Sequence, residues 1–200
     1  MKRIRVLLAA LLSAVTVLSF AACVDGDGNN NDTGKQPSDS VPTVNKVLIA
    51  YFSCTDTTKR AAEAISEQVE GSDVYRITPA VAYTSADLRY TDSSCRANRE
   101  QNDPASRPEI NGSIENISQY DVIFIGYPIW WGQAPKIIYT FFESYDFSGK
   151  TIIPFCTSGS SPIGSSADNL HGLAPAADWK TGARISGSDV SSLIEQMNER

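Results

Sequence analysis

The chain has 200 residues, of which 42% are hydrophobic and 20% charged, and its formal net charge is −6. This acidic balance argues against a nucleic-acid-binding surface. With one histidine and no cysteines at metal-ligand spacing, the sequence offers no hydrolytic triad and no metal site. We therefore predict no catalytic side chain and no metal.

Residues 1–22 are typical of a secretory signal peptide. Three basic residues within 1–5 precede an apolar run over 6–20 that is short for a membrane span and ends in small residues. Cys23 follows Phe20-Ala21-Ala22, which resembles the lipobox of bacterial lipoproteins. We expect Cys23 to be lipidated and to become the mature N-terminus. The alternative is ordinary cleavage after Ala21, which would release a soluble secreted or periplasmic protein.

The segment that follows lacks the pattern of a folded element. Residues 24–45 are rich in Gly, Asn, Asp, Ser and Pro and have no apolar periodicity. Such a segment cannot bury a core. We expect residues 23–45 to be a disordered tether and residues 46–200 to be the folded domain, which is long enough for one core. The lipid anchor would be its only attachment to the membrane.

Five apolar runs in residues 46–200 predict β-strands, at about 46–52, 73–77, 120–126, 150–156 and 181–186. The runs are continuous, as in strands covered on both faces. Helical stripes occupy 61–69, 138–142 and 190–197. This alternation predicts an α/β fold, a three-layer sandwich around a parallel sheet with right-handed crossovers.

The segment 79–119 interrupts this alternation. It carries four arginines and two tyrosines, and it shows little periodicity. A loop of this length is usually functional or disordered. It either covers the ring end of a ligand site or is a surface excursion with one helical stretch near 85–101.

Two loops follow the first and third predicted strands, and their side chains differ in kind. The first loop offers hydroxyls: Ser53, Thr55, Thr57 and Thr58. Hydroxyls and free backbone amides at a helix start suit a phosphate. The second offers flat rings: Tyr127, Trp130 and Trp131. Rings suit a planar conjugated system, and ligands bind where strand order reverses in an open parallel sheet. A phosphate at one end and a ring at the other describe FMN.

Three motifs resemble those of the flavodoxin superfamily, most closely its exported bacterial branch. They are S-x-T-x-x-T at 53–58, Y-P-I-W-W-G at 127–132 and P-F-C-T-S-G at 154–159. The resemblance covers about 46–200 and implies FMN as cofactor and a five-stranded sheet of order 2-1-3-4-5. Of the two tryptophans we favour Trp131 for stacking on the flavin. The expected cofactor-binding residues are Ser53, Thr55, Asp56, Thr57, Thr58, Pro128, Ile129, Trp130, Trp131, Gly132, Thr157, Ser158, Gly159 and Ser160.

Asp56 is a departure from the family pattern, which usually has Gly there. Asp tolerates a positive φ better than most residues. We expect its carboxylate to point away from the phosphate and to cap the helix that starts near Thr57.

The resemblance implies an FMN-binding redox protein that transfers electrons outside the cytoplasmic membrane to an unidentified redox partner. One alternative is an FMN-dependent reductase that takes hydride from NAD(P)H and passes it to a quinone or similar small acceptor. No G-x-G-x-x-G fingerprint supports a stable dinucleotide site for that reaction. A second alternative is a binding module that has lost its flavin.

Overall fold

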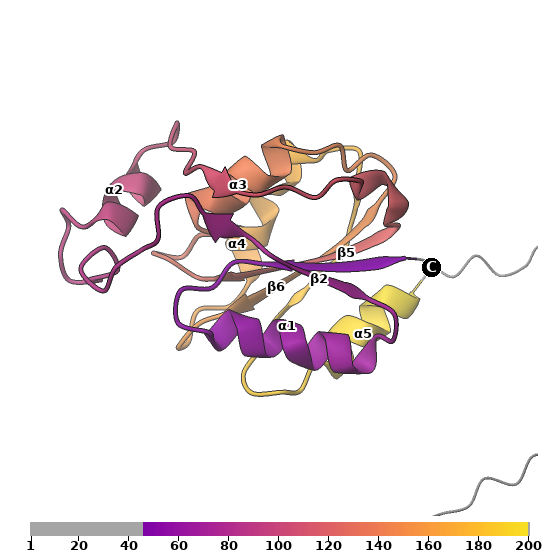
Figure 1. Ribbon diagram of the computed structural model, residues 1–200. Helices are drawn as coiled ribbons and strands as arrows, with labels where there is room; N and C mark the ends of the chain where they lie inside the picture. Colours follow the sequence, from indigo (N-terminus) through magenta and orange to yellow (C-terminus); the bar gives the residue numbers. More distant parts are fainter. Residues whose placement is uncertain (1–45, 200) are drawn as a thin grey trace, which may run out of the picture. The chain divides into compact units, whose positions relative to one another are not determined.

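A sheet between two layers of helices forms the part of the chain that the computed structural model describes, residues 46–199 (Figure 1). The predicted signal peptide, the tether and Cys23 lie outside these residues. The main sheet has the order β2-β1-β5-β6-β7, and β8 pairs with β6. All its pairings are parallel. Its strands are β1 Val47–Tyr51, β2 Asp73–Arg76, β5 Val122–Pro128, β6 Thr151–Thr157, β7 Asp178–Trp179 and β8 Ala183–Arg184.

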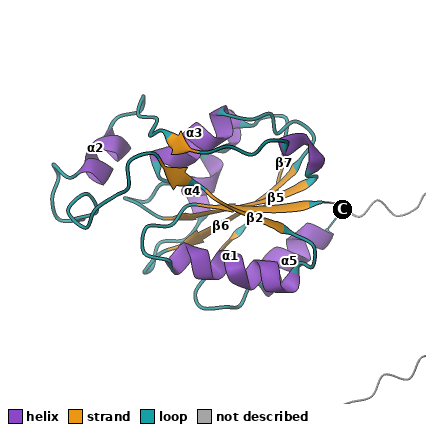
Figure 2. Cartoon of the chain, in the orientation of Figure 1, coloured by secondary structure: helices purple, strands orange, loops and turns teal. Residues whose placement is uncertain are grey.

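Helices cover both faces of this sheet, as Figure 2 shows. Alternate residues on each strand face opposite layers: Ile49 and Phe124 pack in the cluster with α1 and α5, whereas Leu48 and Ile123 pack with α3. Within residues 46–199 no helix is long and apolar enough to cross a membrane. The helices are α1 Thr57–Gln68, α2 Arg96–Asn102, α3 Lys136–Glu143, α4 Gly164–Asp168 and α5 Ser191–Asn198, with 3-10 turns at Ile117–Gln119 and His171–Leu173.

The predicted three-layer architecture and the strand order 2-1-3-4-5, counted along the chain, are confirmed. The prediction of a single last strand at 181–186 was wrong. Two short strands replace it, β7 beside the start of β6 and β8 beside its end. Gly182 separates them with a φ of +70°, and a Cβ there would lie 2.1 Å from the carbonyl oxygen of Pro154. The chain thus passes too close to β6 at this point for any other residue.

Strand β2 also departs from the prediction that every strand is covered on both faces. Its residues are mostly exposed, and Val74 keeps 47% of its surface accessible. The reason is its place at the edge of the sheet, where it has a neighbouring strand on one side only.

Most of the segment 79–119 is an excursion over residues 80–109, which is closed at its base by a short antiparallel pair, β3 Thr78–Pro79 with β4 Ile110–Asn111. Its helix α2 is shorter than the predicted stretch 85–101. Side chains ahead of α2 accept hydrogen bonds from backbone N–H groups, which favours turns over a longer helix. The Asp87 carboxylate accepts the Thr84 N–H at 2.8 Å, and the Cys95 sulfur accepts the Asn98 N–H at 3.4 Å. In Figure 1, α2 lies beyond the end of the sheet at which β1 and β5 finish.

Candidate functional site

A cavity of about 450 Å³ opens where β1, β5 and β6 end, and we call it the main cavity. Its volume lies in the range of small-molecule sites. The three loops predicted from the sequence all contribute to its wall, and the loop after β8 adds a fourth segment. The lining residues are Thr55, Thr57, Pro128, Ile129, Trp130, Thr157, Ser158, Gly159, Ile185, Ser186 and Gly187.

Part of the main cavity wall is suited to an anion. Thr55 and Thr57 line it, and their hydroxyl oxygens lie 3.4 Å apart. Helix α1 begins at Thr57, no side chain caps its first amides, and no acidic residue lies in its first turn. Unpaired N–H groups and the positive end of the helix dipole therefore border this part of the cavity.

Thr58 has a different role from its neighbours in the loop. It is buried, and its hydroxyl lies 2.8 Å from the hydroxyl of Thr157 at the end of β6. The Ile129 N–H donates to the Thr157 carbonyl at 2.9 Å, which extends the contact between β5 and β6. Thr58 and Thr157 thus join the two loops, whereas Ser53 lines a neighbouring cavity around Arg76.

Asp56 has the left-handed conformation expected where the family has Gly, with φ 58°. The predicted helix cap was wrong, because its side chain makes no hydrogen bond to α1. A capping side chain needs an extended backbone, and Asp56 is left-handed. Its carboxylate instead lies 3.8 Å from Nη2 of Arg76, at the end of β2. Asp56 is absent from the lining of the main cavity, so its side chain points away from the cavity, as expected.

One of the two tryptophans lines the main cavity. Trp130 lines the main cavity and packs edge-on against Phe52 and Tyr83, with ring centroids 5.5 and 5.2 Å apart. Trp131 lies outside that lining, and its ring stacks on Tyr90 at 4.9 Å and 10°. The structure therefore places Trp130 at the cavity, and the flavin contact favoured for Trp131 stays a prediction.

Gln101 of α2 holds the aromatic loop in place. Its Nε2 donates to the carbonyls of Trp130 and Ala134 at 3.1 and 3.2 Å, and its Oε1 accepts the Lys136 N–H at 3.2 Å. One side chain thus satisfies three backbone groups of the loop after β5. Sequence reasoning missed Gln101, because a glutamine on a short helix carries no pattern of its own.

A family model described as flavodoxin matches residues 46–200. The chain belongs to the flavodoxin family. Two crystal structures of candidate flavoproteins are similar to it. The one from Bacteroides eggerthii is 47% identical, with a TM-score of 0.71, over 76% of this chain and 96% of that chain. The one from Bacteroides uniformis is 42% identical, with a TM-score of 0.72, over 78% of this chain and 99% of that chain.

A more distant flavodoxin-like structure shares the fold. It is a flavoprotein from Lactobacillus acidophilus, crystallised in complex with FMN. It is 22% identical to this chain, with a TM-score of 0.60, and the match covers 78% of this chain and 99% of that one. No curated protein matches the chain significantly.

Within this flavodoxin domain, some predicted residues lie off the main cavity and some unpredicted ones lie beside it. Gly132 and Ser160 do not line it, although Gly132 supplies a φ of +78° in the turn that pairs Trp130 with Gln133. Arg60 was missed. Its Nη2 lies 3.5 Å from the Thr57 hydroxyl, and it lines an adjoining cavity of about 270 Å³. Its i+3 spacing from Thr57 on the predicted helix was the available signal.

The loop at 185–187 was also missed, because the sequence assigned part of it to the last strand. Ile185, Ser186 and Gly187 follow β8 and close the main cavity beside the Thr157 loop.

The cysteines of the flavodoxin domain are not built as nucleophiles. Cys54, Cys95 and Cys156 are free thiols. Burial raises the pKa of both Cys54 and Cys156 to about 12, so both are protonated at neutral pH. Among residues 46–199 no group of His, Cys, Asp and Glu could hold a metal ion.

Proposed function

We propose that the chain binds FMN in the main cavity and acts as an electron-transfer protein outside the cytoplasmic membrane. One observation carries the proposal: a single cavity is lined by the Thr55 and Thr57 hydroxyls beside the uncapped start of α1 and also by Trp130. This arrangement matches a ligand that has a phosphate and a flat ring system.

The residues present fit the group. Thr55, Thr57 and the first amides of α1 would hold the phosphate, with Arg60 as a nearby cation. Pro128, Ile129 and Trp130 would contact the ring from one loop. The segment Thr157 to Gly159 would offer hydroxyls and backbone amides to it from the other. Bound FMN supplies the transfer of one or two electrons, and the protein holds it and controls access.

Charge around the cavity favours retention of an anionic ligand. The left-handed backbone of Asp56 turns its carboxylate toward the end of β2, and this residue does not line the main cavity. The uncapped start of α1 remains available to the phosphate. The acidic balance of the whole chain opposes the additional negative charge that FMN would gain on reduction. It therefore favours a low reduction potential of the bound FMN.

The location is inferred from the first residues of the sequence. A basic start, a short apolar run and Cys23 after small residues support export and a lipid anchor at the outer face of the membrane. The tether at 23–45 would let the domain reach a redox partner from that anchor.

Titration of the full-length protein tests the cofactor assignment. We expect FMN to bind, and riboflavin, which lacks the phosphate, to bind more weakly. Replacing Thr55 and Thr57 together with Ala should weaken FMN binding by about 1 to 3 kcal/mol per hydroxyl and leave riboflavin binding nearly unchanged. A colourless protein that binds neither flavin would contradict the proposal and favour the flavin-free binding module.

Rapid-mixing kinetics then test electron transfer against the alternative reductase. NADH or NADPH should reduce the FMN-loaded protein slowly, because the sequence has no dinucleotide fingerprint. Rapid reduction at low nicotinamide concentration, followed by turnover with a quinone, would identify the reductase instead.

A further inference from the structure

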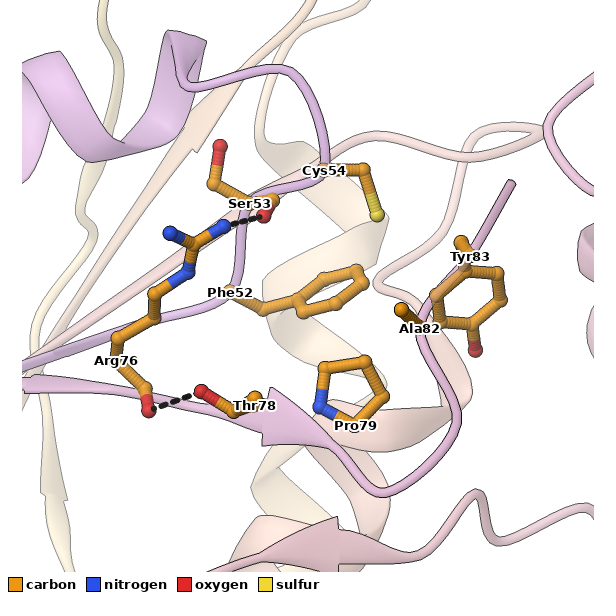
Figure 3. Close-up of a pocket in the computed structure, with 8 residues that line it drawn as sticks. All are labelled: Phe52, Ser53, Cys54, Arg76, Thr78, Pro79, Ala82 and Tyr83. Atoms are coloured by element: carbon orange, nitrogen blue, oxygen red, sulfur yellow. Dashed lines mark hydrogen bonds between the residues drawn. The ribbon is translucent and has the colours of Figure 1, made fainter. Parts of the chain in front are cut away.

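Ser53 and Cys54 line a second cavity, whereas Thr55 and Thr57 of the same loop line the main cavity, and we call the second one the Arg76 cavity. Its volume is about 330 Å³, which is within the range of small-molecule sites. The lining residues are Phe52, Ser53, Cys54, Arg76, Thr78, Pro79, Ala82 and Tyr83. Figure 3 shows Arg76 on one side and Ala82 with Tyr83 on the opposite side, with the rings of Phe52 and Pro79 between them.

The polar side of the Arg76 cavity carries a cation with unused donors. Nη2 of Arg76 donates to the Ser53 carbonyl at 3.0 Å, which fixes the guanidinium at the cavity. Its pairing with Asp56 is long, 3.8 Å, and both side chains are about half exposed, so this pairing is weak. Within residues 46–199, Nε and Nη1 of Arg76 donate no hydrogen bond. Because both forked edges of a guanidinium include Nη2, Nε and Nη1 can each donate a single hydrogen bond to a carboxylate oxygen.

The apolar side is held rigidly. Tyr83 lies under the guanidinium of Arg96 at 4.0 Å, and its hydroxyl donates to Glu100, which in turn pairs with Arg96 at 2.6 Å. The Phe52 ring is almost fully buried and meets Tyr83 edge-on, with centroids 5.8 Å apart. A flat ring entering this cavity would meet a wall that is already ordered, which lowers the cost of binding.

We propose that the Arg76 cavity binds a small flat organic anion, with its carboxylate on Arg76 and its ring against Pro79 and Tyr83. This site is separate from the FMN site and does not require FMN to be bound. Phe52 and Tyr83 form part of its wall and also contact Trp130, which lines the main cavity. A ligand here would therefore sit one layer of aromatic side chains away from the main cavity.

The test uses 2-naphthoate, a flat aromatic carboxylate, and its uncharged analogue 2-naphthamide. Calorimetric titration of the full-length protein should detect 2-naphthoate and find 2-naphthamide bound about tenfold more weakly or worse. Arg76→Gln should weaken 2-naphthoate binding by about tenfold or more. The matched control is Arg99→Gln, because Arg99 is exposed, does not line the Arg76 cavity and donates its side-chain hydrogen bond to Ser94 among the described residues. This control should change the affinity less than about twofold.

A second variant guards against loss of folding. Ala82 is an exposed lining residue, so Ala82→Trp should fill the cavity without disturbing the core. It should abolish 2-naphthoate binding and leave FMN affinity within about twofold of the unmodified chain.

Three results would overturn the inference: no binding of 2-naphthoate, equal binding by Arg76→Gln, or competition between 2-naphthoate and FMN. The last would place the naphthoate in the main cavity. If FMN itself fails to bind, the 2-naphthoate titration still tests the Arg76 cavity, so the two proposals fail separately.

Discussion

The hydroxyl oxygens of Thr58 and Thr157 lie 2.8 Å apart in the buried region between the first turn of α1 and the end of β6, although the residues are 99 positions apart in the chain. The bond connects the loop with the phosphate-binding hydroxyls to the loop expected at the flavin ring. It also fixes how far apart two sides of the main cavity stand. The two loops of the proposed FMN site therefore depend on each other for their positions.

Thr58→Val should destabilise the protein, because it leaves the Thr157 hydroxyl buried without its partner. We expect a loss of about 1 to 3 kcal/mol in the free energy of unfolding. Thr58→Val combined with Thr157→Val should recover part of that loss, since both polar groups are then removed. Urea unfolding measures both. A double variant as unstable as the sum of the two single variants would show that the hydroxyls do not interact.

Gln101→Ala should loosen the aromatic loop, because the carbonyls of Trp130 and Ala134 and the N–H of Lys136 lose their partner. The expected cost is about 1 to 3 kcal/mol in unfolding free energy, with weaker FMN binding. Asn102→Ala is the control, since Asn102 bonds only to Asn98 of its own helix. Fluorescence titration with FMN compares them. Equal affinities of both variants would contradict a positioning role for Gln101.

Tyr75→Phe should leave stability unchanged or raise it by up to about 1 kcal/mol. Its hydroxyl is buried and has no hydrogen-bond partner among the described residues. Tyr120→Phe provides the contrast, because the Tyr120 hydroxyl donates to Oδ2 of Asp73 at 2.7 Å. That variant should lose about 1 kcal/mol. Chemical denaturation distinguishes them, and a clear loss for Tyr75→Phe would reveal a partner for its hydroxyl.

Cys54 should react slowly with iodoacetamide at neutral pH, because burial raises its pKa to about 12. Only the thiolate reacts. Since the group loses its proton as pH rises, the rate should increase about tenfold per pH unit and show no plateau up to about pH 10. A variant in which Cys54 is the only cysteine makes its alkylation rate measurable, and the same variant unfolded in urea gives the rate of an exposed thiol. A plateau of the rate near the pKa of the unfolded variant would show that Cys54 is exposed in the folded protein.

Cys23→Ala should prevent lipidation and leave the chain either uncleaved or free of the membrane, because Cys23 is the only acceptor in the lipobox-like segment. Membrane fractionation and intact-mass measurement of the unmodified chain check this prediction. A mature N-terminus at Ala22 without added lipid would decide for the secreted alternative.

Most of the sheet could be predicted because its strands are continuous apolar runs, such as Val122 to Gly126, that are too short for a typical helix. The strand order came from the resemblance, since local patterns carry no information on which strands pair. The split into β7 and β8 depends on the close approach of Gly182 to Pro154, a tertiary contact. The contacts of Gln101, Arg76 and Tyr83 arise in the same way, from segments brought together only by folding. The prediction that Asp56 caps α1 was wrong, because the left-handed backbone of Asp56 turns its carboxylate toward Arg76 at the end of β2.

The pair β3 and β4 joins the base of the excursion over only two residues on each side. Insertions or deletions between these strands leave the register of β1, β5 and β6 untouched, because no residue of the excursion pairs with the main sheet. The excursion can therefore change in length and in its side chains during evolution, while the loops of the main cavity keep their positions. Relatives that share the cofactor loops but serve different partners should differ most between residues 80 and 109.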